Sequence, residues 1–311
     1  MARRLPLVQV DEAHSTWIEA PDIQRAFELQ PRFVQPDHGS LWWTICFALM
    51  PSLYFMHSVL PKFCDDSEGR SQAMRRCVVS CFTLLWAALA FTSLMLASFR
   101  NPGIVPTPLG GAPAAVPNRS IFVNGVKISQ KFCNTCRLYR PLRSKHCVYC
   151  NRCIFRYDHH CPWLGNCIGL GNYRTFLCLI STSVLFFSQA AMITYRVLQG
   201  RYALQKLGSE HGAGIAFRHI MVGSWAESTF LLYAVILAVA LSVLVMYHFI
   251  LVTFNLTTNE HVRGYYDDSG NPFHEGCLEN YKQVACLPFG HPLKELRIPE
   301  PVDKLRAQRC R

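Results

Sequence analysis

The sequence contains few charged residues for its length. Of its 311 residues, only 16% are Asp, Glu, Lys or Arg, whereas a typical soluble domain has about 25%. Half of the residues are hydrophobic, yet the mean hydropathy is only +0.14, so the apolar residues must be concentrated in blocks. This composition argues against an ordinary soluble protein and makes the position of those blocks the first question.

Cysteine is too sparse for a small disulfide scaffold. The 15 cysteines are an odd number, so at least one thiol stays outside any fully paired internal set. The chain also lacks a heptad pattern and any internal repeat with a period of about 20 to 50 residues, which excludes a coiled coil and a solenoid. We expect no cleaved signal peptide, because forty mostly polar residues precede the first apolar run.

Four apolar runs are each long enough to cross a hydrocarbon core, which needs roughly 20 helical residues. None contains Asp, Glu, Lys or Arg, and they cover residues 41–60, 77–99, 175–195 and 228–256. Pro51 in the first run is acceptable because neighbouring helices can satisfy the freed backbone. Buried helices of a large soluble protein are the alternative, but four such runs are hard to accommodate there. The sequence predicts an α-helical integral membrane protein with four transmembrane helices.

The basic residues predict the orientation of these helices. An even number of spans places the segment 1–40, the loop 101–172 and the tail 257–311 on one side. With Arg100 and Arg174 at the two ends of the loop included, that side carries 23 of the 31 Lys and Arg residues. The positive-inside rule therefore makes both termini and the middle loop cytosolic. The net charge of +11 thus mainly reflects the excess of Lys and Arg in the segments expected to be cytosolic. The glycosylation sequons at Asn118 and Asn255 lie on this side and should carry no glycan.

The middle loop contains a compact cysteine module at about residues 131–173, after a linker rich in Pro and Gly. Seven cysteines and three histidines fall within 35 residues: Cys133, Cys136, His146, Cys147, Cys150, Cys153, His159, His160, Cys161 and Cys167. The Cys-x2-Cys spacings are typical of zinc ligands, and the cytosol disfavours disulfides. We expect metal binding to supply folding free energy that this short segment cannot obtain from a core.

The number of candidate ligands exceeds the number required. Two closed tetrahedral sites need about eight ligands, so a Cys and a His of the ten are left over. Adjacent residues of an extended chain face opposite ways, which predicts that His146 and Cys147 serve different metals and that the two sites interleave. The same alternation puts His159 and Cys161 on one face. A spare Cys beside a spare His is the minimum for an activated thiolate, but spacing alone leaves open which pair is spare.

The segment Asp158-His159-His160-Cys161-Pro162-Trp163 resembles the DHHC family of protein S-acyltransferases. Further matches extend over about residues 41 to 285. They include Asn101-Pro102-Gly103 (with Asn replacing the family's Asp), residues 140–147, Asn166-Cys167-Ile168-Gly169, Asn172-Tyr173, Thr257-Thr258-Asn259-Glu260, and Asn271-Pro272-Phe273 with Gly276 and Asn280. The joint occurrence of these motifs with four apolar runs is highly specific.

The resemblance implies a role for each residue of the module. One zinc ion would be held by Cys133, Cys136, His146 and Cys153, and the other by Cys147, Cys150, His160 and Cys167. Cys161 would then be the nucleophile, His159 its general base and Asp158 the partner that orients His159, in the logic of a catalytic triad. Thr258 would hold the Asp158 segment, and Asn280 would brace the C-terminal element.

The implied function is a protein S-palmitoyltransferase. The acyl group of palmitoyl-CoA or another long-chain acyl-CoA would pass through a Cys161 thioester to cysteine thiols of substrate proteins. Four basic residues lie close to the metal ligands, and we expect them to meet the CoA phosphates; ordinary positive-inside surface charge is the alternative. These residues are Arg140, Arg143, Lys145 and Arg156.

Partners and location follow from the same resemblance. Protein substrates would carry membrane-proximal cytosolic cysteines, the lipid bilayer would surround the helices, and the acyl chain would enter a cavity among them. The resemblance leaves open whether an accessory subunit binds, and no nucleic-acid partner is expected. The location would be an endomembrane (Golgi or ER) or the plasma membrane. The competing hypothesis is a membrane-anchored zinc-finger interaction module, such as a RING-like ubiquitin ligase. It shares interleaved zinc sites but gives no reason for a paired Asp and His beside an extra Cys.

Overall fold

The computed structural model describes residues 8–10, 31–64, 70–107, 118–124, 126–208 and 222–286. It divides into two compact units. One comprises residues 38–95 and 175–247, and the other comprises the remaining segments, including residues 96–174 and 248–286. Most of the expected N-terminal segment, the Pro-rich linker at 108–117 and the tail beyond residue 286 lie outside the described residues.

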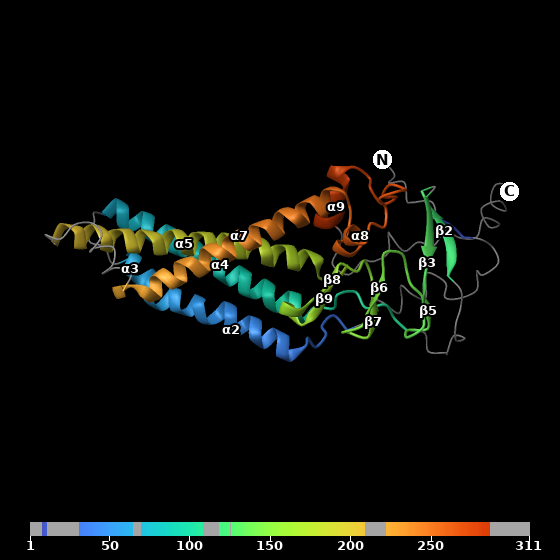
Figure 1. Cartoon of the computed structure of the whole chain (residues 1–311), viewed down its shortest axis with the longest axis horizontal. Coiled ribbons are helices and arrows are strands. Elements are labelled where there is room, and N and C mark those ends of the chain that lie inside the picture. Colours follow the sequence, from blue (N-terminus) through green and yellow to red (C-terminus); the bar gives the residue numbers. More distant parts are fainter. Residues whose placement is uncertain are drawn as a thin grey trace. The chain divides into compact units, whose positions relative to one another are not determined.

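Within the described residues, four helical segments are long and apolar enough to cross a membrane, and their helices are labelled in Figure 1. Helix α2 (His38–Tyr54) continues through a π-helical segment (Phe55–Val59) into α3 (Leu60–Cys64), and the other three are α4 (Arg70–Phe99), α5 (Tyr173–Gly208) and α7 (Trp225–Thr253). Most helix ends lie beyond the uncharged runs, since polar residues beyond the hydrocarbon core also form helical hydrogen bonds; the end of α7 at Thr253 falls three residues short of the end of the fourth run. The expected fold class, a helical membrane protein with a cysteine-rich module, is confirmed.

The apolar surface of these helices is consistent with a lipid environment. Helix α7 has almost no polar face, and many of its large apolar side chains are exposed, which is rare on a soluble protein; they include Leu232, Val239, Val243, Met246 and Ile250. Helices of the same unit pack through a core that contains Phe55, Phe186 and Phe230. The rings of Phe55 and Phe230 stack with centroids 5.3 Å apart.

Pro51 interrupts the backbone ladder of α2, and a neighbouring helix compensates. Proline has no N–H to donate to the carbonyl four residues earlier, which belongs to Phe47. The Tyr233 hydroxyl on α7 donates a hydrogen bond of 2.7 Å to this carbonyl. The proline in the span is therefore satisfied by a side chain from another helix, as expected in a membrane.

One carboxylate lies inside the fourth helix, which begins three residues before the uncharged run. Glu227 is 5% exposed, and its Oε1 contacts Lys62 Nζ at 2.7 Å and Arg201 Nη1 at 3.2 Å. Both cations come from other helices of the unit. A buried charge is tolerated in such a position only when it is paired.

The second unit is built from short antiparallel hairpins rather than from a continuous sheet. Strands β2 (Arg119–Val123) and β3 (Val126–Gln130) pair with each other, and β1 (Val8–Val10) pairs with β2. Three smaller hairpins follow: β4 (Phe132–Cys133) with β5 (Leu138–Tyr139), β6 (Lys145–Cys147) with β7 (Arg152–Ile154), and β8 (His159–Cys161) with β9 (Asn166–Ile168). Two short helices complete it, α8 (Thr258–Val262) and α9 (Cys277–Cys286).

Two asparagines tie the last hairpin to the end of α4. Asn166 Nδ2 donates to the carbonyls of Ser98 and Arg100 at 2.8 and 3.0 Å. Asn172 Nδ2 donates to the carbonyls of Ala97 and Cys167 at 3.1 and 2.9 Å. The last carbonyls of a helix have no partner within the helix, so these amides cap α4 and at the same time fix the β8–β9 hairpin beside the start of α5.

Candidate active site and metal centres

The structure brings the eight expected metal ligands together in two separate clusters. Cys133, Cys136, His146 and Cys153 form one cluster, and Cys147, Cys150, His160 and Cys167 form the other. Within each cluster all ligand atoms lie within 4.8 Å of one another. These are the two ligand sets that the family resemblance implies, and zinc binding by them is a proposal.

Hairpin register explains why the clusters interleave. A Cys-x2-Cys turn at the tip of one hairpin supplies two ligands, and a cross-strand His–Cys pair on the next hairpin supplies the others. His146 pairs with Cys153 across β6–β7, and His160 pairs with Cys167 across β8–β9. The β6–β7 hairpin therefore serves both clusters, and His146 and the adjacent Cys147 belong to different clusters because successive residues of a strand point to opposite faces.

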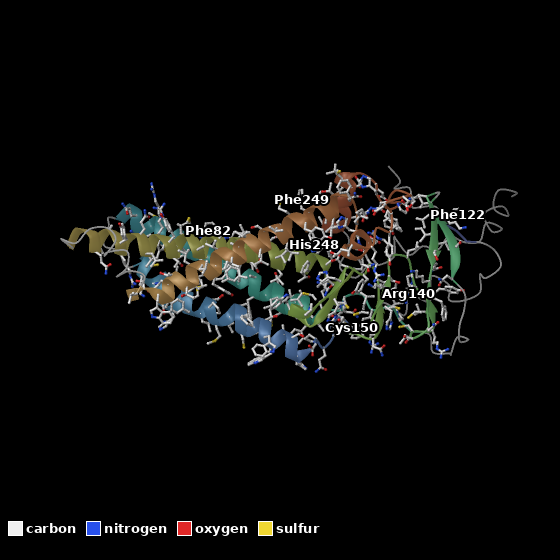
Figure 2. All side chains as sticks on the ribbon, viewed as in Figure 1. Phe82, Phe122, Arg140, Cys150, His248 and Phe249 are labelled. Atoms are coloured by element: carbon white, nitrogen blue, oxygen red, sulfur yellow. The ribbon has the colours of Figure 1, made fainter. Side chains whose placement is uncertain are left out.

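The interatomic distances fit tetrahedral zinc. Bonds of about 2.3 Å to sulfur and about 2.0 Å to nitrogen in a tetrahedron put S and N roughly 3.5 Å apart. In the first cluster, His146 Nδ1 lies 3.5, 3.3 and 3.9 Å from the sulfurs of Cys133, Cys136 and Cys153. In the second, His160 Nδ1 lies 3.7, 3.5 and 3.6 Å from those of Cys147, Cys150 and Cys167 (Cys150 is labelled in Figure 2). Three thiolates and one imidazole form a donor set that favours zinc.

Cys161 lies outside both clusters, at the end of β8. It is 7% exposed and pairs with Asn166 across the hairpin. The chain then turns through a short 3-10 helix (Pro162–Leu164) to Gly165, which has a φ of +60°. A Cβ at Gly165 would lie 2.5 Å from the Asp37 carbonyl oxygen, so only glycine fits this turn. Trp163 in the turn is 63% exposed.

Asp158 fixes the orientation of His159 beside Cys161. Asp158 Oδ2 lies 2.7 Å from His159 Nδ1, so Nδ1 carries the proton and Nε2 remains for proton transfer. Burial opposes the charged imidazole, but hydrogen bonds to Asp158 and Cys161 outweigh it and raise the pKa of His159 to about 9. Burial likewise opposes ionisation of Asp158, but His159 and the Thr258 amide lower the pKa of that carboxyl.

Asp158 is in turn held by the segment that follows α7. The amide N–H and the hydroxyl of Thr258 donate to the two carboxylate oxygens at 2.8 and 2.7 Å. Thr258 lies at the start of α8, where Thr257 and Glu260 form a reciprocal capping box. The Thr-x-x-Glu spacing is a sequence signature of such a helix start, so the local structure of this segment was readable from the residues alone.

Arg143 is engaged within the protein. Its side chain is 1% exposed, and its Nη2 lies 2.8 Å from Glu260 Oε2. Its Nε donates to Glu260 Oε1 at 2.8 Å, and its Nη1 donates to Asn255 Oδ1 at 3.0 Å. Burial opposes charge on Glu260, but Arg143 lowers the pKa of this carboxyl. The buried pair joins the metal module to α8, and the Arg143 guanidinium does not face solvent.

The other three basic residues differ in their surroundings. Arg156 Nη2 donates to Asn255 Oδ1 at 2.8 Å. Lys145 Nζ donates to Asn259 Oδ1 at 2.9 Å and lies 5.1 Å from the centre of the Tyr157 ring, and burial lowers its pKa. Arg140 Nε is buried and has no hydrogen-bond partner among the described residues (Figure 2). Of the four residues expected to meet CoA, Arg140 therefore has a donor without a partner among the described residues, and Lys145 is held by one hydrogen bond and one aromatic ring.

Asn280 on α9 braces the end of α7. Its Nδ2 donates to the Thr253 carbonyl at 2.7 Å, and its Oδ1 accepts from the Glu275 amide at 3.2 Å. Asn255, two residues beyond α7, has a positive φ of 51° and is 1% exposed. Sequence reasoning missed Asn255, because nothing in the local pattern shows that it accepts from two arginines far away in the chain.

Comparison with known proteins agrees with this geometry. The model of the DHHC palmitoyltransferase family matches residues 126–264. The chain is 32% identical over 248 residues to Probable protein S-acyltransferase 1 of Arabidopsis thaliana, covering 71% of this chain and 68% of the relative. It is 32% identical over 280 residues to Probable protein S-acyltransferase 6 of the same plant, covering 85% and 65%. A third relative, Palmitoyltransferase ZDHHC8 of Canis lupus familiaris, is 33% identical over 200 residues, which are 62% of this chain and 24% of that protein.

The chain spans about two thirds of the length of the two plant relatives. The matched region contains both cysteine clusters, the Asp158–Cys161 segment and the Thr258 segment. The match, the four apolar helices and the geometry of the two clusters lead to one conclusion, that this chain belongs to the DHHC family of protein S-acyltransferases.

Proposed function

We propose that this protein is a protein-cysteine S-palmitoyltransferase that transfers a long-chain acyl group from acyl-CoA to cysteine thiols of substrate proteins. One observation carries the proposal: Cys161 belongs to neither cluster and lies beside a histidine that a buried carboxylate holds at 2.7 Å. A metal-binding interaction module has no use for such an arrangement, so the structure favours the enzyme over a RING-like ligase.

The reaction has two steps at the same sulfur. His159 Nε2 takes the proton of the Cys161 thiol, and the thiolate attacks the thioester carbonyl of acyl-CoA. The bond between the carbonyl carbon and the CoA sulfur breaks, and CoA leaves as a thiol with the proton from His159. In the second step His159 deprotonates the substrate thiol, which takes the acyl group, and Cys161 leaves as a thiolate. Each step exchanges one thioester for another, so the enzyme only has to lower barriers.

The zinc ions would be structural in this mechanism. Three cysteines and one histidine at each cluster complete a closed tetrahedral shell, and a closed shell has no position for substrate. The ions would hold the hairpins β4–β5, β6–β7 and β8–β9 in the register that presents Cys161. Asp158, fixed by Thr258, would hold the Nδ1 proton of His159 so that Nε2 is the atom that takes and returns the proton of Cys161.

The acyl chain would stay within the membrane during transfer. Cys161 lies 12 residues before the start of α5, and the ring of His159 is close to that of His248 on α7, with centroids 6.3 Å apart. From this position Cys161 would reach the thioester carbonyl while the acyl chain remains among apolar side chains. Each CH₂ of the acyl chain that is kept out of water there contributes about 0.8 kcal/mol. Substrate cysteines near the cytosolic face of the membrane would be the natural acceptors.

The CoA phosphates would meet Arg140 and Lys145. Their cationic groups lie beside the metal clusters, and Arg140 has the unpartnered Nε noted above. Arg143 and Arg156 would instead position the module through Glu260 and Asn255. We further propose that both termini are cytosolic, as the distribution of Lys and Arg indicates, and that the protein resides in the endomembrane system or the plasma membrane.

The test is self-acylation of the purified protein. The full chain in detergent or nanodiscs is incubated with palmitoyl-CoA, and the adduct is located by mass spectrometry and by its sensitivity to hydroxylamine. We expect an adduct on Cys161 that Cys161→Ser abolishes while about two zinc ions per chain remain. Cys277→Ser, which removes an exposed cysteine of α9, is the matched control and should acylate normally. An adduct that survives Cys161→Ser refutes the proposal.

A further inference from the structure

His248 is a buried histidine inside a membrane-spanning helix. It lies near the end of α7 (labelled in Figure 2), and it is 1% exposed. A buried ionisable side chain in a span is costly and needs a partner. His57, the histidine of the first span, is exposed and so has no comparable constraint. The position of His248 therefore requires a specific explanation.

Two residues of the same structural unit surround the His248 ring. The Tyr173 hydroxyl lies 3.1 Å from His248 Nδ1, and with a neutral imidazole the hydroxyl donates to Nδ1. The rings of His248 and His159 have centroids 6.3 Å apart and planes inclined by 42°. His248 thus connects the first residue of α5 to the histidine beside Cys161.

Tyr173 itself has a rigid support. It follows Asn172, which is fully buried and donates hydrogen bonds to the carbonyls of Ala97 and Cys167. The Tyr173 amide donates to the Gly169 carbonyl at 3.0 Å. The backbone of this turn is therefore fixed to the strand that carries Cys167. This fixed backbone places the Tyr173 hydroxyl within hydrogen-bond distance of His248 Nδ1.

The Asp158 hydrogen bond holds His159 through one ring atom, Nδ1. Together with the covalent bond to Cβ it sets the mean orientation of the ring, but small changes in the two side-chain torsions still move Nε2 relative to the Cys161 sulfur. A neighbouring ring limits the amplitude of this motion. Because a displacement of about 1 Å at a reacting group can cost up to 100-fold in rate, the second contact matters for chemistry.

We propose that His248, held by Tyr173, is a positioning residue for His159. The inference rests on the proposed function, since it concerns the base of the same transfer. His248 does not touch the reacting atoms. It acts by limiting the orientation of the His159 ring so that Nε2 stays directed at Cys161. The competing explanation is that His248 is only a packed polar contact between α5 and α7.

The experiment compares four variants of the full-length protein. Tyr173→Phe removes one oxygen atom, His248→Gln keeps a planar hydrogen-bonding group, and His248→Ala removes the ring. His57→Gln is the control for a change at an exposed histidine of a different span. Pre-steady-state self-acylation is measured over a range of palmitoyl-CoA concentrations, together with zinc content and the midpoint of thermal unfolding.

We expect a loss in the maximal rate rather than in the apparent affinity for palmitoyl-CoA. His248→Ala should lower the rate about 10- to 30-fold and Tyr173→Phe about threefold, with two zinc ions retained. His248→Gln should recover part of the loss, and His57→Gln should be unchanged. If His248→Ala does not fold, Tyr173→Phe decides the question. Wild-type rates in Tyr173→Phe and His248→Ala would overturn the inference.

A double-mutant cycle separates positioning from general packing. If His248 acts through His159, then His248→Ala should cause no further loss in a protein that already carries His159→Ala. A loss of equal size in both backgrounds would show that His248 merely supports the fold and would refute the proposal. The outcome is distinct from failure of the proposed function, which would appear as an adduct that persists in Cys161→Ser.

Discussion

Asp158 has a partner at each of its oxygens, and all are needed to keep its carboxylate in place. Oδ2 receives His159 Nδ1 and the Thr258 hydroxyl, and Oδ1 receives the Thr258 amide. The side chain is 2% exposed, so water cannot replace a lost donor. At the scale of single residues, the site therefore depends on a segment about 100 residues further along the chain.

We predict that Thr258→Val slows acylation. The change removes the hydroxyl donor to Asp158 and leaves the backbone donor. A hydrogen bond to a charged group contributes about 1.5 to 3 kcal/mol, which corresponds to at least a tenfold lower rate when the Asp158–His159 pair loses its geometry. Single-turnover self-acylation measures the effect, and the zinc content should be unchanged. Thr44→Val, which alters a threonine that bonds within its own helix, is the control; a wild-type rate in Thr258→Val would contradict the prediction.

The buried Arg143–Glu260 pair leads to a prediction about stability. Glu260→Gln leaves an arginine buried without its counter-charge, and breaking such a pair typically costs about 3 to 5 kcal/mol. We expect a clearly lower midpoint of thermal unfolding in detergent. Glu279→Gln disrupts the exposed pair with Lys282 and should change the midpoint little. Equal midpoints for Glu260→Gln and Glu279→Gln would show that the buried pair contributes no more than a surface pair.

The same pair determines a pH dependence. Because folding lowers the pKa of Glu260, its stabilising contribution is complete above the ordinary carboxyl pKa of about 4.3. The contribution is lost as the pH falls through the lower folded-state pKa. The difference in unfolding midpoint between wild type and Glu260→Gln should therefore be constant near neutral pH and shrink only in acid. A difference that shrinks between pH 8 and pH 6 would assign the effect to another group.

At the scale of elements, the β6–β7 hairpin couples the two metal centres. It supplies His146 and Cys153 to one cluster and Cys147 and Cys150 to the other. Short two-stranded hairpins are marginal on their own in water. The register of the β6–β7 hairpin would therefore depend on both ions, and the centres should not behave as independent sites.

We predict that Cys133→Ala lowers the zinc content by more than one ion per chain. The substitution opens the first site, and the β6–β7 hairpin then loses the register that the second site needs. Elemental analysis of the purified protein tests this, with Cys277→Ser as the control that retains about two ions. A content of one zinc per chain in Cys133→Ala would show instead that the sites are independent.

At the scale of the whole molecule, topology decides which compartment supplies the substrates. Asn118 is exposed, so a glycosylation enzyme on the same side of the membrane could reach it. If the middle loop is cytosolic, the sequon at Asn118 stays unmodified in cells. A double change, Glu210→Asn with Gly212→Ser, introduces a sequon in the loop between the third and fourth runs and should be glycosylated. A glycan at Asn118, detected by an endoglycosidase shift, would overturn the orientation.

The local features were readable from the sequence. Uncharged runs of about 20 residues predict spans whatever their neighbours, since the hydrocarbon core excludes charge. Strand alternation separates His146 from Cys147 and places His159 with Cys161 because the side-chain period of a strand is fixed by its backbone. The family motifs supplied the ligand sets, and the structure groups the same residues. The sequence also shows that Pro51 lies within the first run. It does not show that the Tyr233 hydroxyl donates to the carbonyl that Pro51 leaves without a hydrogen bond.

The sequence by itself determined the positions of the apolar runs and the concentration of Cys and His in the module, and the family motif added the two expected ligand sets and the expected spare Cys–His pair. Only the tertiary structure decided how distant segments meet. Arg143 was expected to face CoA, but the fold buries it against Glu260, and His248 was one polar residue in an apolar run until α7 brought it against His159. Hydrophobic and side-chain periodicity carries information only about residues close together in the sequence. The buried ion pair and the ring contact join residues about 90 to 120 positions apart, and no local sequence pattern encodes such contacts.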